Sequence, residues 1–165
     1  MKALIIYDSV YGNTEQIARA IANGFIPYKD IVLLRVCEVK PELLKELNIL
    51  IAGSPTQRFR LTSPMNDMLG SIPLNGLKGV KAAAFDTRLS LSHIESSIER
   101  FAVKNGGYAA KGIANKLKKS GGELVMPPEG FFVKGMEGPL LEGELERAAD
   151  WAKQILGILE KRDES

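Results

Sequence analysis

Residues 3–18 decide the fold class, and they read Ala3-Leu4-Ile5-Ile6-Tyr7-Asp8-Ser9-Val10-Tyr11-Gly12-Asn13-Thr14-Glu15-Gln16-Ile17-Ala18. The first five form an almost unbroken apolar run, which is typical of a strand buried on both faces of a sheet. From Thr14 the apolar residues follow helical spacing through Ile17 and Ile21, and Gly24 is a helix stop. A buried strand leading directly into an amphipathic helix predicts the first unit of a parallel α/β sheet.

The same strand–turn–helix pattern recurs along the chain. Further strands are predicted at residues 31–36, 48–52 and 80–85, with two extended candidates, 123–126 and 130–134, split by Pro127-Pro128. Further helices are predicted at residues 41–47, 63–69, 92–104, 108–119 and 143–160. This alternation predicts a doubly wound, five-stranded parallel sheet with helices on both faces. Because no repeat or linker interrupts the pattern, residues 1–165 are expected to form a single domain.

Composition narrows the function classes. The chain has 165 residues, of which 45% are hydrophobic and 25% charged, and its net charge of +2 gives no electrostatic argument for nucleic acid. No apolar run approaches the roughly 20 residues that a membrane span needs, and no secretory signal opens the chain, so a cytoplasmic location is expected. One cysteine and one histidine exclude an internal disulfide and give no metal cluster. Cys37, among apolar neighbours, is expected to be buried at the end of a strand.

The loop after the first strand suits a phosphate. In open α/β sheets the ligand binds beyond the carboxyl ends of the strands. Ser9 and Thr14 supply hydroxyls, Gly12 allows close approach of the backbone, and Asn13 adds a side-chain amide. Free N–H groups at the helix start favour an anion. Hydrogen bonds to a charged group contribute about 1.5–3 kcal/mol each, so several together hold a phosphate without a lysine.

Two common nucleotide motifs are missing from this loop. It has neither the Gly-Lys-Ser/Thr of a Walker-type site nor the Gly-x-Gly-x-x-Gly of a dinucleotide site. The pattern that remains predicts a monophosphate bound by neutral donors. The alternative is a hydroxyl-rich turn that starts the helix and binds no ligand.

Residues 5–18 closely resemble the phosphate-loop signature of the flavodoxin family, in which an apolar strand and a hydroxyl residue precede Gly-x-Thr at a helix start. Val10 departs from the signature, because a polar residue is more usual there. The resemblance implies a flavodoxin-like sheet of order 2-1-3-4-5 and flavin mononucleotide (FMN) as the cofactor. It also implies that residues Ser9, Val10, Tyr11, Gly12, Asn13 and Thr14 bind the phosphate.

The resemblance further implies that the loops after the third and fourth strands hold the flavin ring. The first reads Gly53-Ser54-Pro55-Thr56-Gln57-Arg58-Phe59-Arg60, and the second reads Asp86-Thr87-Arg88-Leu89-Ser90. Ser54 and Thr56 are expected near the ribityl chain, and Phe59 against the ring or as a loop anchor. The expected contacts in these loops are Ser54, Pro55, Thr56, Gln57, Arg58, Phe59, Asp86, Thr87 and Arg88.

Two features depart from an ordinary flavodoxin. Flavodoxins often place a glycine beside the reactive flavin nitrogen, whereas residues 57–59 contain none. They also surround the ring with acidic residues, whereas this chain offers Arg58, Arg60 and Arg88. A cation near the ring stabilises an anionic reduced flavin. Our hypothesis is that the fully reduced state is easier to reach here than in a typical flavodoxin.

Two functions from different classes fit these residues. The first is an FMN-binding electron-transfer protein that exchanges electrons with redox partner proteins. The alternative is a small FMN-dependent NAD(P)H:quinone-type oxidoreductase. The chain is short and has no nicotinamide motif, which favours the carrier, and no catalytic residue is assigned. A flavodoxin fold without cofactor is a third possibility, and the oligomeric state is left open.

Overall fold

The computed structural model describes residues 1–26, 28, 30–90 and 107–164. Its strands are β1 (Lys2–Tyr7), β2 (Asp30–Arg35), β3 (Ile49–Pro55), β4 (Lys81–Leu89), β5 (Glu123–Leu124) and β6 (Glu129–Val133). Its helices are α1 (Asn13–Gly24), α2 (Ser63–Ser71), α4 (Ala109–Lys119) and α5 (Glu144–Asp163), with 3-10 turns at Val36–Glu38 and Pro41–Leu44. The helix expected at 92–104 lies outside the described residues.

The strands form one parallel sheet in the order β2-β1-β3-β4-β5, which confirms the predicted order. The expected fifth strand is present in two pieces. β5 pairs with the start of β4, and β6 pairs with its second half, from Phe85 to Leu89. Pro127 and Pro128 separate the pieces because proline has no N–H to donate to a neighbouring strand.

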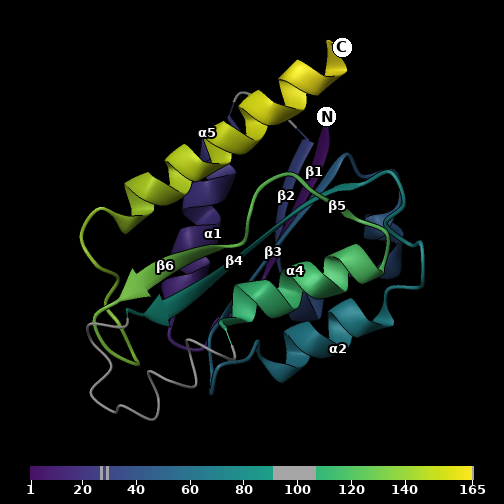
Figure 1. Ribbon diagram of the computed structural model, residues 1–165. Helices are drawn as coiled ribbons and strands as arrows, with labels where there is room; N and C mark the ends of the chain where they lie inside the picture. The colour runs from purple at the N-terminus through teal and green to yellow at the C-terminus, as the bar shows by residue number, and fades with distance from the viewer. Residues whose placement is uncertain (27, 29, 91–106, 165) are drawn as a thin grey trace.

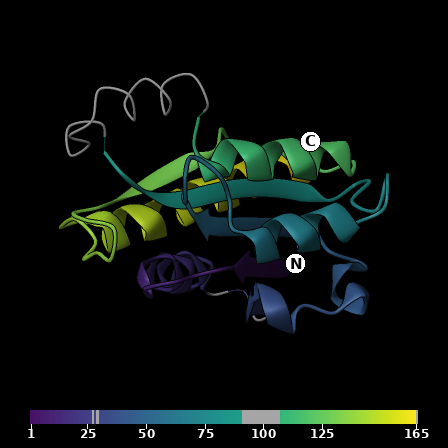
Figure 2. The same cartoon turned by 90° about the horizontal axis from the view of Figure 1, so that it is seen from below.

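Helices cover both faces of the sheet, as predicted (Figure 1). α1 and α5 lie together on one face, and α2 and α4 lie side by side on the other (Figure 2). Along β1, Ile5 packs toward α1 and α5, whereas Leu4 and Ile6 pack toward α2 and α4. Trp151 of α5 is 3% exposed and contacts the rings of Phe85 and Phe131 edge-on, so it belongs to the core on this face.

Two strands extend further than the sequence predicted. β3 continues to Pro55 and β4 to Leu89, so Ser54, Asp86 and Arg88 stand in strands and not in loops. The extension follows from pairing, because Ser54 lies opposite Asp86 and β6 covers the other side of β4. These polar side chains are therefore held by the sheet itself at its carboxyl end.

The chain between β2 and β3 differs most from prediction. The expected helix at 41–47 is a 3-10 turn over Pro41–Leu44. Cys37 is exposed, so the prediction of a buried thiol is wrong. β2 ends at Arg35, and the 3-10 turn that follows turns Cys37 away from the sheet. No helix in the described part of the chain combines the length and apolarity that crossing a bilayer requires.

Candidate functional site: an open helix start at the carboxyl end of the sheet

The loop between β1 and α1 is shaped by Gly12 and Ser9. Gly12 begins the helix with φ +90°, a left-handed conformation that favours glycine. The Ser9 hydroxyl oxygen accepts the Gly12 N–H at 3.1 Å and the Glu15 N–H at 3.4 Å. Ser9 therefore braces the turn from within, and its own O–H remains free to donate outward.

Four backbone N–H groups of this loop are left without an acceptor. In the described part of the chain, no protein group accepts from the N–H groups of Val10, Tyr11, Asn13 or Thr14. No side chain caps α1. Unpaired N–H groups and the positive end of the helix dipole together favour an anion. This donor set fits a monophosphate.

The side chains of Asn13 and Thr14 connect the loop to distant segments. The Asn13 amide donates to the Glu137 carbonyl at 3.1 Å, which ties α1 to the loop between β6 and α5. Because this side-chain amide already donates to Glu137, the backbone N–H of Asn13 is the donor that this residue leaves for an anion. The Thr14 and Thr87 hydroxyl oxygens lie 2.8 Å apart, and both side chains are buried. Thr87 of β4 thus stands beside the start of α1.

Asp8 and Arg35 hold the loop between β1 and α1 through hydrogen bonds to the Ser9 backbone. The buried Asp8 carboxylate accepts the Ser9 N–H at 3.0 Å and the Thr62 hydroxyl at 2.5 Å. The Arg35 guanidinium donates to the Ser9 carbonyl and lies 3.8 Å from Asp8. Sequence reasoning missed Arg35, because it stands at the end of β2, opposite Tyr7 in the sheet register. The sequence feature that could have identified it is an arginine as the last residue of the strand paired with β1.

The loop after β3 is a tight hairpin. Gln57 and Arg60 exchange backbone hydrogen bonds of 2.8 and 2.9 Å. Between them, Arg58 and Phe59 have φ of +47° and +66°. Two-residue hairpins with positive φ at both positions usually carry Asn-Gly, so this turn holds two side chains in a costly conformation. Arg58 is exposed and Phe59 half-buried.

Asp86 and Arg88 form a buried ion pair beneath the start of α4. The Asp86 carboxylate accepts from Arg88 at 2.6 and 2.8 Å and from the Ala110 N–H at 2.8 Å. Burial raises the pKa of Asp86, and the bonds from Arg88 and Ala110 oppose that rise. The Arg88 guanidinium also stacks 3.6 Å from the Tyr108 ring centroid and lies over Gly130. Asp86 therefore balances the Arg88 charge, and the hypothesis of an easily reduced flavin now rests on Arg58 and Arg60.

The hydroxyl groups of Ser54 and Thr56, at the carboxyl end of the sheet, hydrogen-bond to other groups of the protein. The Ser54 hydroxyl donates to the Pro55 carbonyl at 2.9 Å and accepts the Thr62 N–H at 3.0 Å. The Thr56 hydroxyl oxygen accepts the Ala109 N–H at 3.1 Å, at the start of α4. The structure thus brings Thr14 to Thr87, and it gathers Thr56, Asp86 and Arg88 at α4. All of these lie at the carboxyl end of the sheet.

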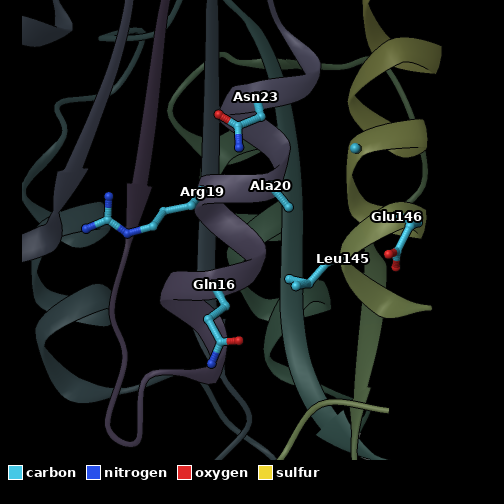
Figure 3. Close-up of a pocket in the computed structure, with 7 residues that line it drawn as sticks. Gln16, Arg19, Ala20, Asn23, Leu145 and Glu146 are labelled. Carbon is cyan, nitrogen blue, oxygen red and sulfur yellow. The ribbon is translucent and has the colours of Figure 1, made fainter. Parts of the chain in front are cut away.

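A separate groove of about 460 Å³ lies between α1 and α5. Figure 3 shows Gln16, Arg19, Ala20 and Asn23 of α1 on one side, with Leu145 and Glu146 of α5 on the other. The groove is open and runs along the outer surface of the helix pair. None of the residues predicted for cofactor binding lines it.

Comparison with curated proteins gives a partial match to a flavoprotein. No family model matches. The putative diflavin flavoprotein A 4 of Synechocystis is 30% identical over 113 residues, which are 66% of this chain and 19% of that protein. The chain thus spans about a fifth of the length of this curated relative.

Solved structures match over nearly the whole chain. A flavodoxin from the domain Archaea is 25% identical, with a TM-score of 0.73 over 97% of this chain and 99% of that one. Flavodoxin 2 of Bacillus cereus is 24% identical, with a TM-score of 0.73 over 95% and 99%. The rubredoxin oxygen:oxidoreductase of Desulfovibrio gigas is 22% identical, with a TM-score of 0.75 over 99% of this chain and 37% of that one. With the sheet order, these similarities confirm that the chain has a flavodoxin-like fold.

Proposed function

We propose that this protein binds FMN and serves as an electron-transfer protein that exchanges electrons with partner proteins. One observation carries the proposal: the start of α1 offers four unpaired N–H groups around Gly12, with the Ser9 hydroxyl beside them. The flavodoxin-like fold, and the likeness to solved flavodoxins, support the same cofactor and activity. Bound FMN supplies the redox chemistry, because its ring takes up and releases electrons.

The protein's own part is binding and orientation. The N–H groups of Val10, Tyr11, Asn13 and Thr14 hold the phosphate, and Gly12 keeps the approach open. Ser9 donates the free O–H of its bracing hydroxyl. This donor set contains no charged side chain, so the oriented backbone and the helix dipole balance the phosphate charge.

For the flavin ring we infer two kinds of residue. Gln57, Arg58 and Phe59 form the accessible hairpin and contact the ring directly. The second kind supports the ring site without donating to the flavin, because these residues bond within the protein or stand in strands. They are Ser54, Pro55, Thr56, Asp86 and Arg88. Thr87 belongs with the phosphate side through its bond to Thr14.

The reductase alternative requires room for a nicotinamide over the ring, and no observation favours it over the carrier. Titration of the purified protein with FMN tests the carrier proposal first. We expect one FMN per chain, seen as quenching of flavin fluorescence, with saturation at micromolar or lower concentration. Absence of binding at that concentration contradicts both redox functions. If FMN binds, rapid bleaching of its absorbance by NADH or NADPH identifies a reductase, and slow bleaching supports a carrier.

A further inference from the structure

Three cations at the carboxyl end of the sheet have no carboxylate partner among the described residues. Arg58 and Arg60 are exposed on the Gln57–Arg60 hairpin, and Lys111 is exposed in the first turn of α4. Within the described residues none of these three side chains has an ion pair or hydrogen bond. We call Arg58, Arg60 and Lys111 the basic rim.

Other arginines of the chain contrast with the basic rim. Arg19 pairs with Glu15 at 2.7 Å, and Arg147 pairs with Glu144 at 2.7 Å. Arg88, close to the rim in the fold, is held by Asp86 at 2.6 Å. Among the residues that the structure describes, Arg58 and Arg60 therefore differ from these three arginines in having no carboxylate partner.

The basic rim borders a small groove of about 170 Å³. Arg60 and Lys111 line it together with the apolar or aromatic side chains of Phe59, Leu61 and Tyr108. No lining residue is acidic. The first turn of α4 adds the positive end of its helix dipole. Asp86, the carboxylate that accepts the Ala110 N–H at that helix start, is fully buried and already paired with Arg88.

We propose that the basic rim and its groove form the docking surface for a redox partner with an acidic surface, which inserts an aspartate or glutamate side chain between Arg60 and Lys111. The proposal rests on the proposed function, because the rim includes the hairpin that we infer to contact the flavin ring. Unpaired cations repel one another, and an acidic partner relieves that repulsion while gaining attraction. Phe59, Leu61 and Tyr108 in the groove contact the methylene groups of the inserted aspartate or glutamate.

The local charge of the basic rim, more than the net charge of the whole chain, selects the partner. The chain carries 22 basic and 20 acidic residues, so its overall field is weak. A local cluster beside the hairpin that we infer to contact the flavin ring still steers an oppositely charged partner into a productive orientation. α4 also carries Lys116, Lys118 and Lys119 in its last turn, at the opposite end of the same helix. That second cluster provides a matched control for the position of the charge.

The first experiment uses the protein without FMN and therefore stands apart from the proposed function. The inert paramagnetic anion hexacyanochromate(III) is titrated into labelled protein, and broadening of each backbone amide signal is recorded. At low salt we expect broadening at residues 57–61 and 108–112, separate from any at the proposed phosphate loop, residues 9–14. The broadening at 57–61 and 108–112 is expected to disappear at 0.3 M salt, where the Debye length is shorter than the roughly 8 Å of 0.15 M salt, and in the Arg60→Ala/Lys111→Ala variant. The Lys118→Ala/Lys119→Ala variant, with the same loss of charge, is expected to keep it. Broadening that is uniform, or confined to residues 116–119, overturns the proposal.

The second experiment measures electron transfer from FMN-loaded, reduced protein to small oxidants. Each fully reduced flavin, in its anionic form, gives one electron to each of two hexacyanoferrate(III) anions and releases one proton to solvent. We expect this anion to react several-fold more slowly with Arg60→Ala/Lys111→Ala than with the unchanged protein. The cation hexaammineruthenium(III) is expected to react as fast or faster with the variant. Equal loss for both oxidants overturns the proposal, and absence of FMN binding contradicts only the proposed function.

Discussion

The hydroxyl groups of Thr14 and Thr87 lie 2.8 Å apart and join the first turn of α1 to the carboxyl end of β4. Both side chains are buried. Because one O–H is used in this bond, the pair keeps one further O–H to donate. The phosphate site that we propose therefore extends from the loop after β1 to a strand two positions away in the sheet.

Replacing Thr87 by valine tests this extension. Thr87→Val removes the partner of the Thr14 hydroxyl and one donor, and we expect a loss of about 0.5–1.5 kcal/mol in FMN binding, or roughly two- to tenfold in affinity. Thr87→Ser keeps the hydroxyl and is expected to bind nearly as tightly as the unchanged protein. Isothermal titration with FMN and with riboflavin checks it. An equal loss for riboflavin, which has no phosphate, places the effect elsewhere.

Arg35 is expected to position the phosphate loop. It holds the Ser9 carbonyl, which leaves the N–H groups of the turn free for an anion. Arg35→Ala should therefore weaken FMN binding several-fold and leave riboflavin binding almost unchanged. Arg19→Ala serves as the control, because it removes the same charge from an exposed pair with Glu15 on α1. If both variants weaken binding equally, general electrostatics and not the Ser9 contact is responsible.

The hairpin at Arg58 stores strain that can be relieved. Arg58 has φ +47°, and asparagine tolerates this conformation better than arginine. Arg58→Asn is expected to raise the free energy of unfolding by about 0.5–1 kcal/mol. Arg60 has no positive φ, so Arg60→Asn is expected to change stability little. Urea denaturation of the FMN-free protein measures both, and stabilisation by Arg60→Asn alone contradicts the account.

Acid sensitivity is expected from Glu144 at the start of α5. Burial alone raises its pKa, but hydrogen bonds from Arg147 and the Phe132 N–H outweigh burial and hold the pKa below its usual 4.5. A lowered pKa in the folded state means stability that is present above pH 4.5 and lost as the pH falls through the folded pKa.

The matched variant for this pH dependence is Glu144→Gln. We expect it to lower the free energy of unfolding by about 1–3 kcal/mol at neutral pH, because it loses charge-assisted bonds to Arg147 and Phe132. The difference between the two proteins should shrink below pH 4.5. A difference that is constant from pH 7 to pH 3 shows that the Glu144 charge contributes nothing.

The sequence predicted the elements that depend on local patterns. The apolar run of β1, the spacing of α1 and the turn at Gly12 all follow from neighbouring residues, and the strand alternation predicted the layers. The ends of β3 and β4 were missed. Ser54 and Asp86 look like loop residues, and only their pairing in the sheet keeps them extended.

Side-chain partners distant in sequence were also missed. Asn13 binds Glu137, and Arg35 reaches Ser9, because sheet order and loop path bring them together. Arg88 was expected near the flavin ring as a cation, and its pairing with Asp86 depends on both standing on the same face of β4. Composition and local spacing carry no information about such contacts.

The most direct test of the central claim compares the affinities of the unchanged protein for FMN and for riboflavin, which differ only by the phosphate. If the open start of α1 at Gly12 holds that phosphate, FMN binds at least about tenfold more tightly, because each hydrogen bond to a charged group contributes about 1.5–3 kcal/mol. Equal affinities for FMN and riboflavin would contradict the assignment of this loop as a phosphate site.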